Sequence, residues 1–192
     1  MQSYDTLILN SVKSQRLARQ ATPVAPTVTF ADDIEVLNYA LTLEHLEAAF
    51  YLLAPNYTLG QDPFGNSIDE WAALAGEHEA THVTTLTDVI TQLGGTPVAA
   101  ATYDFGVVDA ASFLETAAVL ENVGVSAYDG AGQFLTNPDL LTAAGTIVAV
   151  EARHAAYFNL VTGVIPFPSA YETPLTPDEV LAAAGGFIVS EG

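Results

Sequence analysis

The stretch AVEARHAAYFNLV, residues 149–161, places ionisable side chains inside a run of alanine and larger apolar residues. Apolar residues at spacings of three and four predict a helix over about residues 138–163. Glu151 and His154 both belong to its apolar stripe, three residues apart, so they point to the same side. The buried face of this helix therefore carries a carboxylate and an imidazole, and both groups need a partner in the core.

The segment GEHEATH, residues 76–82, repeats this arrangement. Its predicted helix opens with the capping pattern Ser67-x-x-Glu70 and ends at the two glycines of residues 94–95. Glu79 and His82 lie on its apolar stripe, again three residues apart. Two Glu-x-x-His pairs therefore face the interior of one domain.

Two further long helices are predicted over residues 32–54 and 109–135. Each carries one glutamate in the middle of its stripe and a tyrosine seven residues later, two turns along the same face. These residues are Glu44 with Tyr51 and Glu121 with Tyr128. The order Glu/Tyr, Glu-x-x-His, Glu/Tyr, Glu-x-x-His indicates an internal duplication.

Four helices of roughly 22 to 27 residues predict an all-α fold, a four-helix bundle spanning residues 31–165. A basic segment and a Pro- and Thr-rich linker precede the bundle over residues 1–30. A Pro-rich tail follows over residues 166–192 and carries a short helix from about Pro177. No run has strand alternation long enough to compete with this prediction.

Carboxylates gathered at one level of a core repel one another and resist ionisation, whereas two divalent cations would balance four negative charges. The chain has no cysteine, and oxygen-rich coordination with two imidazoles suits iron or manganese. One Glu from each of two helices and Glu-x-x-His from each of the other two form the ligand set of dimetal carboxylate bundles. The predicted ligands are Glu44, Glu79, His82, Glu121, Glu151 and His154.

Two iron ions are the expected cofactor, with manganese, a mixed Mn/Fe pair or zinc as alternatives. A metal-free core, in which the carboxyl groups hydrogen-bond one another, is the competing interpretation. Tyr51 and Tyr128 are candidate catalytic residues that donate hydrogen bonds to ligand carboxylates or take part in electron transfer. The alternative for both is an ordinary core aromatic residue with a satisfied hydroxyl.

Other ionisable residues near these motifs receive different roles. Glu47 lies on nearly the same side of its helix as Glu44, but only Glu44 repeats the spacing to tyrosine, so Glu47 is expected beside the site. His45 and His78 lie off the stripes and are expected at the surface or boundary. Arg153 is expected to pair with an acidic neighbour.

The chain has 23 acidic and 4 basic residues, for a formal net charge of −19. This charge argues against nucleic acid and anionic membranes as partners, because phosphate would be repelled. So acidic and lysine-poor a composition is typical of proteins that work at high salt, where screening relieves self-repulsion. No membrane span is predicted, and we expect a cytoplasmic protein, or an extracytoplasmic one if the chain is a processed form.

Five segments resemble the ferritin-like superfamily, and together they fall within about residues 31–189. They are VLNYALTLEHLEAAFY, EHEATHVTTL, LENVGVSAYDGA, VEARHAAYFNLV and FPSAYETPLTPDEVL. The last of these is similar to the tail of ferritin-like domain proteins that include the plant desiccation-related proteins and their bacterial, archaeal and fungal relatives. Together with the composition, the resemblance implies a halophilic, archaeal member of that branch.

Three hypotheses for function follow. The leading one is a dimetal oxidoreductase, ferroxidase- or peroxidase-like, that reacts with oxygen or peroxide in metal oxidation or in protection against oxidative or desiccation stress. The second is a non-enzymatic stress or structural protein whose metals only stabilise the bundle. The third is an oxygen-dependent enzyme for an organic substrate, which requires an apolar channel beside the metals. A homodimer is one candidate assembly.

Overall fold

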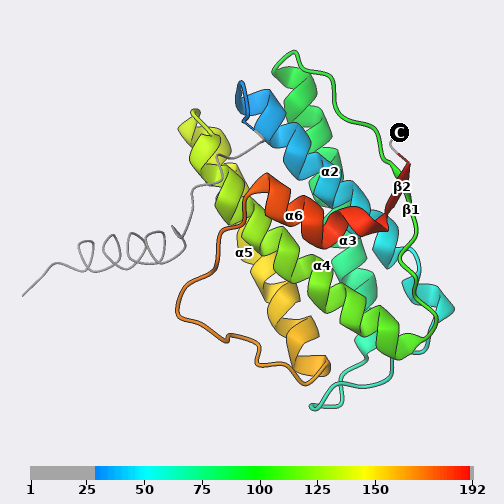
Figure 1. The fold of residues 1–192 in the computed structure, drawn as a ribbon. Coiled ribbons are helices and arrows are strands. Elements are labelled where there is room, and N and C mark those ends of the chain that lie inside the picture. Colours follow the sequence, from blue (N-terminus) through cyan, green and yellow to red (C-terminus); the bar gives the residue numbers. More distant parts are fainter. Residues whose placement is uncertain (1–28, 191–192) are drawn as a thin grey trace, which may run out of the picture.

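The computed structural model describes residues 29–190 and confirms the predicted all-α fold, a four-helix bundle (Figure 1). Its four long helices are α2 (Asp33–Tyr51), α3 (Ile68–Gln92), α4 (Ala110–Ala131) and α5 (Pro138–Val161). Helix α2 packs along α3, and α4 packs along α5. The predicted basic N-terminal segment lies outside the described residues. Among the helices of residues 29–190, none is long and apolar enough to cross a membrane.

Short polar residues begin the helices where the sequence pattern predicted them. The side chain of Asp32 accepts a hydrogen bond from the backbone N of Glu35 at 3.0 Å, and that of Ser67 accepts one from Glu70 at 3.3 Å. Asn137 caps α5, whose first residue is a proline. Two helices end earlier than predicted, because their last turns tighten into the 3-10 segments Ala54–Asn56 and Gly132–Phe134.

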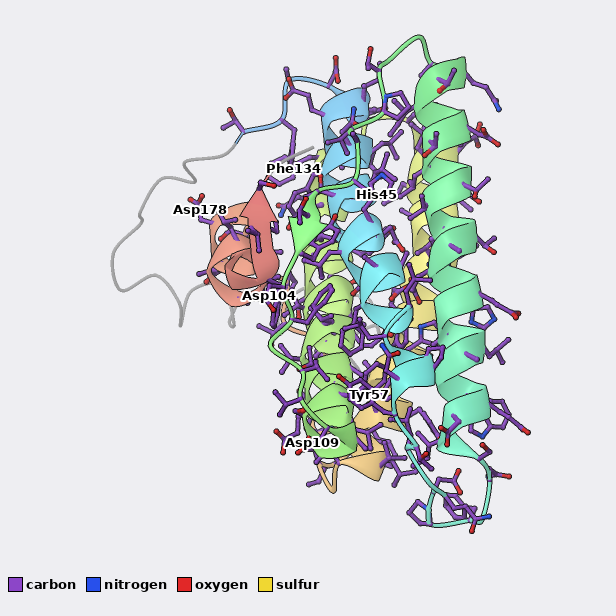
Figure 2. The ribbon with its side chains drawn as sticks, turned by 90° about the vertical axis from the view of Figure 1, so that its right-hand side faces the viewer. His45, Tyr57, Asp104, Asp109, Phe134 and Asp178 are labelled. Carbon is purple, nitrogen blue, oxygen red and sulfur yellow. The ribbon has the colours of Figure 1, made fainter. Side chains whose placement is uncertain are left out.

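A long connection, residues 93–109, runs along the bundle so that α4 starts at the same end as α3 (Figure 1). Several contacts hold it in place, and three of them involve His45, Tyr57 and Asp104, which are labelled in Figure 2. His45 Nε2 donates to the carbonyl of Val98 at 3.2 Å, and the Tyr57 hydroxyl donates to the carbonyl of Val107 at 3.1 Å. The backbone N of Asp104 donates to the carbonyl of Phe187 at 2.9 Å. His45 is therefore a half-buried structural residue, as its place off the stripe predicted.

The C-terminal tail packs back onto the bundle. Helix α6 (Pro177–Ala184) lies against α4, and Val180 from α6 joins a small apolar cluster with Leu43 and Ala127 over the α2/α4 side. After α6, strand β2 (Ile188–Ser190) pairs antiparallel with β1 (Thr102–Tyr103) in the long connection. These two strands are too short to show alternation, which is why the sequence did not predict them.

The core consists of two main apolar clusters on either side of a charged level. One contains the fully buried aromatic rings of Phe50, Phe113 and Phe158, and the other contains Leu41 and Ile90. On α2, Glu44 stands between Leu41 of one cluster and Leu46 and Phe50 of the other. Because both clusters exclude water, the carboxylates between them lie in a low-dielectric layer.

Close packing of the tail on α4 depends on Gly130. The backbone N of Leu175 donates to the carbonyl of Ser126 at 3.0 Å, one turn away from Gly130. A Cβ atom at Gly130 would lie 1.8 Å from the carbonyl oxygen of Leu175, which is far inside van der Waals contact. Only glycine therefore allows the tail backbone to approach the helix here.

We expect Gly130→Ala to displace the tail and to lower the free energy of unfolding by about 1–3 kcal/mol, because the added methyl group overpacks the contact. Chemical denaturation measures this change. Gly145→Ala is the matched control in α5, where an added Cβ meets nothing within 4 Å. That substitution should stabilise the protein by about 0.5–1 kcal/mol. Equal effects of the two substitutions would contradict the close approach.

Candidate metal centre

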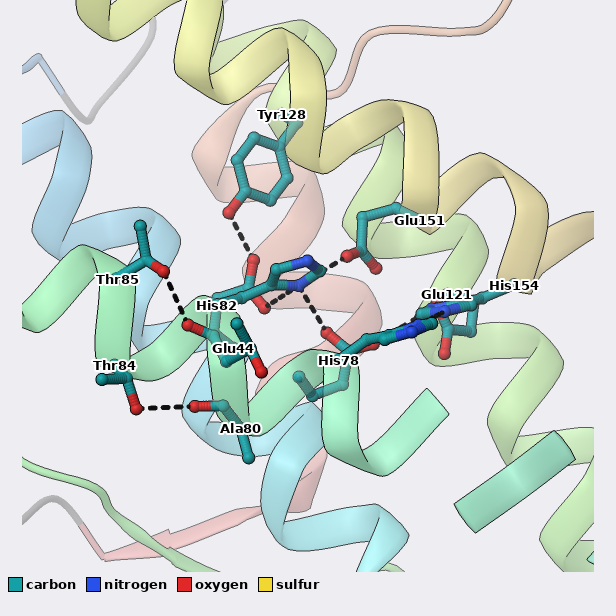
Figure 3. Close-up of polar contacts among 12 residues, drawn as sticks. Glu44, His78, Ala80, His82, Thr84, Thr85, Glu121, Tyr128, Glu151 and His154 are labelled. Atoms are coloured by element: carbon teal, nitrogen blue, oxygen red, sulfur yellow. Dashed lines mark hydrogen bonds and ion pairs between the residues drawn. The ribbon is translucent and has the colours of Figure 1, made fainter. Parts of the chain in front are cut away.

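The four long helices bring all six predicted ligand side chains together in the middle of the bundle (Figure 3). Helices α2 and α4 each contribute a glutamate, and α3 and α5 each contribute a Glu-x-x-His pair. The four glutamates have 0% of their surface exposed, and the two histidines have 9%. The residues are Glu44, Glu79, His82, Glu121, Glu151 and His154.

The six side chains form two overlapping groups of four, each with one ligand atom per residue and all of these atoms within 4.8 Å of one another. Glu79 and Glu151 belong to both groups. Glu44 and His82 complete one group, and Glu121 and His154 complete the other. If each group held one metal ion, the two shared carboxylates would help to hold both ions.

Each histidine turns one ring nitrogen toward several carboxylate oxygens. His82 Nδ1 lies 3.0 Å from Glu79 Oε2, 3.0 Å from Glu151 Oε1 and 3.2 Å from Glu44 Oε2. His154 Nδ1 lies 3.0 Å from Glu79 Oε1 and 3.3 Å from Glu121 Oε2. A ring nitrogen has one proton or one lone pair, so it cannot make a full-strength hydrogen bond to each of two or three oxygens. Nitrogen and oxygen donors that converge in this way fit a common cation.

Several of these buried atoms have no well-aligned hydrogen-bond partner, although some of them lie 3.0–3.3 Å from an imidazole nitrogen. They include both carboxylate oxygens of Glu151, Oε1 of Glu79, Oε2 of Glu121 and Nδ1 of His154. Buried polar atoms are almost always satisfied, since an unsatisfied one costs about 1–3 kcal/mol. Coordination of metal ions would satisfy all of them, so the residues present fit a dimetal centre.

The electrostatics of the cluster favour the same conclusion. Without a cation, burial and the charges of neighbouring glutamates raise the pKa of Glu44 to about 8 and that of Glu121 to about 8, although histidine contacts oppose the shift. Burial lowers the pKa of His82, but the hydrogen bonds that its ring donates to carboxylates outweigh burial and raise this pKa to about 12. The cluster thus retains protons that bound cations would displace.

For Glu79 and His154 too, burial shifts the pKa in one direction and contacts between carboxylate and imidazole shift it in the other. Burial raises the pKa of Glu79, but hydrogen bonds from His154 and His82 outweigh burial and lower that pKa to about 2. Burial lowers the pKa of His154, whereas its contacts with Glu121 and Glu79 raise it to about 10. Protonated imidazole therefore takes the place that a metal cation would take between the carboxylates.

The two tyrosines hold the terminal glutamates crosswise. The Tyr51 hydroxyl on α2 donates to Glu121 Oε1 on α4. The Tyr128 hydroxyl on α4 donates to Glu44 Oε1 on α2 (Figure 3). Burial, followed by the charge of the accepting glutamate, raises the pKa of each tyrosine well above its usual range. Both hydroxyls therefore stay protonated and orient one oxygen of each carboxylate, leaving the other for a ligand.

Glu47 was predicted to lie beside the site, and the structure shows that its side chain is deeply buried. It is 2% exposed but belongs to neither ligand group. Burial, together with the charges of the nearby glutamates, raises its pKa well above the usual range, which favours the neutral carboxyl form. An added Cβ at Gly124 would lie 2.7 Å from Glu47 Oε1, so a glycine on α4 leaves room for this side chain.

His78 is half-buried at the boundary of the bundle, as expected, and it makes a contact that the sequence did not predict: its Nδ1 lies 2.9 Å from Nε2 of His154, and the two stacked rings have centroids 5.2 Å apart. This contact fixes the ring of His154 from the side opposite the carboxylates. Arg153 was expected to pair with an acidic neighbour, but it is exposed and forms no ion pair with any of residues 29–190.

A four-helix bundle with one glutamate on each of two helices and Glu-x-x-His on each of the other two is consistent with a dimetal carboxylate site. The ferritin-like domain family matches residues 32–164, and the chain belongs to this family. No curated protein matches the sequence.

Among solved structures, the chain is similar to a conserved hypothetical protein, rv2844, from Mycobacterium tuberculosis. The two chains are 23% identical, with a TM-score of 0.59, over 71% of this chain and 94% of the other. This likeness supports the bundle fold.

We expect protein purified and then saturated with Mn²⁺ to retain two ions per chain. Glu121→Gln should lower this number toward one, because Glu121 belongs to only one ligand group, whereas Glu79→Gln should weaken both sites. Elemental analysis after desalting measures the stoichiometry. Glu77→Gln, on the exposed face of α3, is the matched control and should leave two ions bound. The two-site arrangement fails if Glu121→Gln retains as much metal as Glu77→Gln.

The pKa shifts also predict how stability depends on pH. A carboxyl group whose pKa is raised on folding stabilises the protein below its unfolded pKa and loses this contribution as pH rises through the folded value. The pKa values of Glu44 and Glu121 rise from 4.5 to about 8, so the melting temperature of chelated protein should fall between pH 5 and 8. Metal must displace these protons, so the stabilisation by Mn²⁺ should grow over the same range. Calorimetric scans with and without Mn²⁺ measure both trends, and a constant difference between them would contradict this account.

Proposed function

We propose that this protein binds two iron or manganese ions and reacts with oxygen or peroxide, in metal oxidation or in protection against oxidative stress. The observation that supports it is the pair of overlapping ligand groups, which share Glu79 and Glu151 and consist of buried carboxylate and imidazole donors. Oxygen-rich sites of this composition favour iron and manganese over softer metals. When bound, the two ions would supply electrons to the oxidant.

The protein's own residues would fix the geometry of this centre. Glu79 and Glu151 would help to hold both ions, while Glu44 and Glu121 would each help to hold one, and Tyr51 and Tyr128 would orient the carboxylates of Glu121 and Glu44. His82 and His154 would complete the ligand set. The apolar clusters on both sides exclude bulk water, which limits side reactions of the oxidant.

A second candidate function is non-enzymatic, with metal ions that only stabilise the bundle. Its support is that the two ligand groups together draw side chains from all four long helices. Ions bound there would crosslink the bundle at its centre and convert binding free energy into folding stability. A redox-silent ion such as zinc would serve this function as well as iron.

We further propose that the chain belongs to the ferritin-like branch that includes the plant desiccation-related proteins, and that it acts in stress protection in the cytoplasm of a halophilic organism. The tail segment FPSAYETPLTPDEVL and the net charge of −19 support this assignment. A homodimer is the assembly proposed for it.

Anaerobic protein loaded with two equivalents of Fe²⁺ should consume oxygen or peroxide, with an absorbance change as iron is oxidised. Glu79→Gln and His82→Gln should lower the initial rate at least about tenfold, because each removes a ligand. Glu77→Gln controls for charge on the same helix. Unchanged rates in both ligand variants would exclude this reaction. Tight Zn²⁺ binding, a large fall in melting temperature on chelation and no turnover would favour the structural function.

A further inference from the structure

A cavity of about 380 Å³ lies in the seam between α3 and α5 and extends to the side chain of His154. Helix α3 contributes Trp71, Leu74 and His78 to its wall, and α5 contributes Arg153, Tyr157 and Phe158. The loop between α2 and α3 closes part of the wall with Phe64. A volume of this size lies at the lower end of the range for small-molecule sites.

The cavity has a polar end and an aromatic end. His78 contacts His154 at one end, and the rings of Trp71 and Tyr157 lie 6.3 Å apart at the other. Trp71 and His78 are seven residues apart on α3, so the two ends are separated by about 10 Å. Arg153 also lies in the cavity wall, at the polar end, because it is the neighbour of His154 in the sequence. The polar end of the cavity is therefore the end at the candidate metal centre.

Arg153 stands out in its electrostatic setting. It is the only lysine or arginine in residues 29–190 of a chain whose net charge is −19. It forms no ion pair with any residue in that range. The one carboxylate in the cavity wall, Asp62, accepts hydrogen bonds from the backbone of Phe64 and Asn66 and from the Asn66 side chain, at 2.8–2.9 Å. Asp62 is thus engaged by its own loop, and Arg153 remains available to an anion.

We propose that this cavity binds a small aromatic carboxylate. Its ring packs against Trp71 and Tyr157, and its carboxylate faces Arg153 at the end beside His78 and His154. Aromatic rings in the wall favour an aromatic ligand through edge and stacking contacts. A guanidinium group recognises a carboxylate through charge-assisted hydrogen bonds.

Binding of this ligand does not depend on the metal reaction proposed above, because protein side chains alone form the cavity. Only a role of the ligand as an oxidised substrate would rest on that function. The experiment therefore measures binding itself, in protein with and without Mn²⁺, and leaves turnover aside.

Trp71 is the only tryptophan of the chain and lines the cavity, so its fluorescence reports on occupancy directly. We titrate three molecules of matched shape: 3-phenylpropionate, 3-phenylpropan-1-ol and 3-phenylpropylamine. At one fixed salt concentration, the acid should bind about tenfold more tightly than the alcohol, and the amine should bind most weakly. The same order is expected with and without Mn²⁺.

Arg153→Gln should abolish the preference for the acid over the alcohol while binding of the alcohol persists. This exposed position tolerates the change, and Thr142→Glu on the exposed face of α5 is the matched control. It alters the net charge by the same amount, eleven residues from Arg153, and should retain the preference.

Three outcomes would overturn the proposal. The first is equal affinity for acid and alcohol in the natural sequence, or a preference that survives Arg153→Gln. The second is binding of the acid only when Mn²⁺ is present, which would place the carboxylate on the metal instead of on Arg153. The third is Trp71 emission that depends on protein concentration and is unaffected by the acid. If sedimentation experiments also showed a dimer, this emission result would indicate that a second copy of the chain covers the seam.

Discussion

The structure depends on the burial of four carboxylates at one level between two apolar clusters. An unpaired carboxylate in such a layer costs several kcal/mol, and four of them repel one another. Protons can relieve part of this cost, as the raised pKa values of Glu44 and Glu121 show. Two divalent cations would offset the whole cost of burying these carboxylates. Their ligands would come from all four long helices. The same requirement that makes the site also holds the four helices in register.

The charged level has two different sides. On the α2/α4 side, tyrosine hydroxyls support the carboxylates crosswise, and α6 covers the seam outside them. On the α3/α5 side stand the histidines, and outside them lies the cavity lined by Trp71 and Tyr157. The first side is therefore covered by α6, whereas on the second side the cavity extends to the candidate metal ligand His154. Any molecule larger than oxygen or peroxide would approach from the second side.

The duplication visible in the sequence explains why the two sides differ. Helices α2 and α4 occupy corresponding positions in the repeat, as do α3 and α5. Each tyrosine therefore reaches the glutamate of the other repeat, and neither half of the chain forms a complete site by itself. Two residues depart from this symmetry. His78 and Arg153 have no counterpart in the other repeat, and both line the cavity.

Helical spacing, together with the known ligand pattern of dimetal bundles, was sufficient to predict the four long helices and the six side chains that converge in the core. Spacing reports which side of a helix faces inward, because apolar residues and the site residues share that side. It does not report which neighbour a side chain meets. The crosswise tyrosine bonds, the stacking of His78 on His154, the unpaired Arg153 and the β1–β2 pair therefore emerged only from the tertiary structure. Each of them depends on the rotation and separation of segments far apart in the chain, and these are set by packing and not by local sequence.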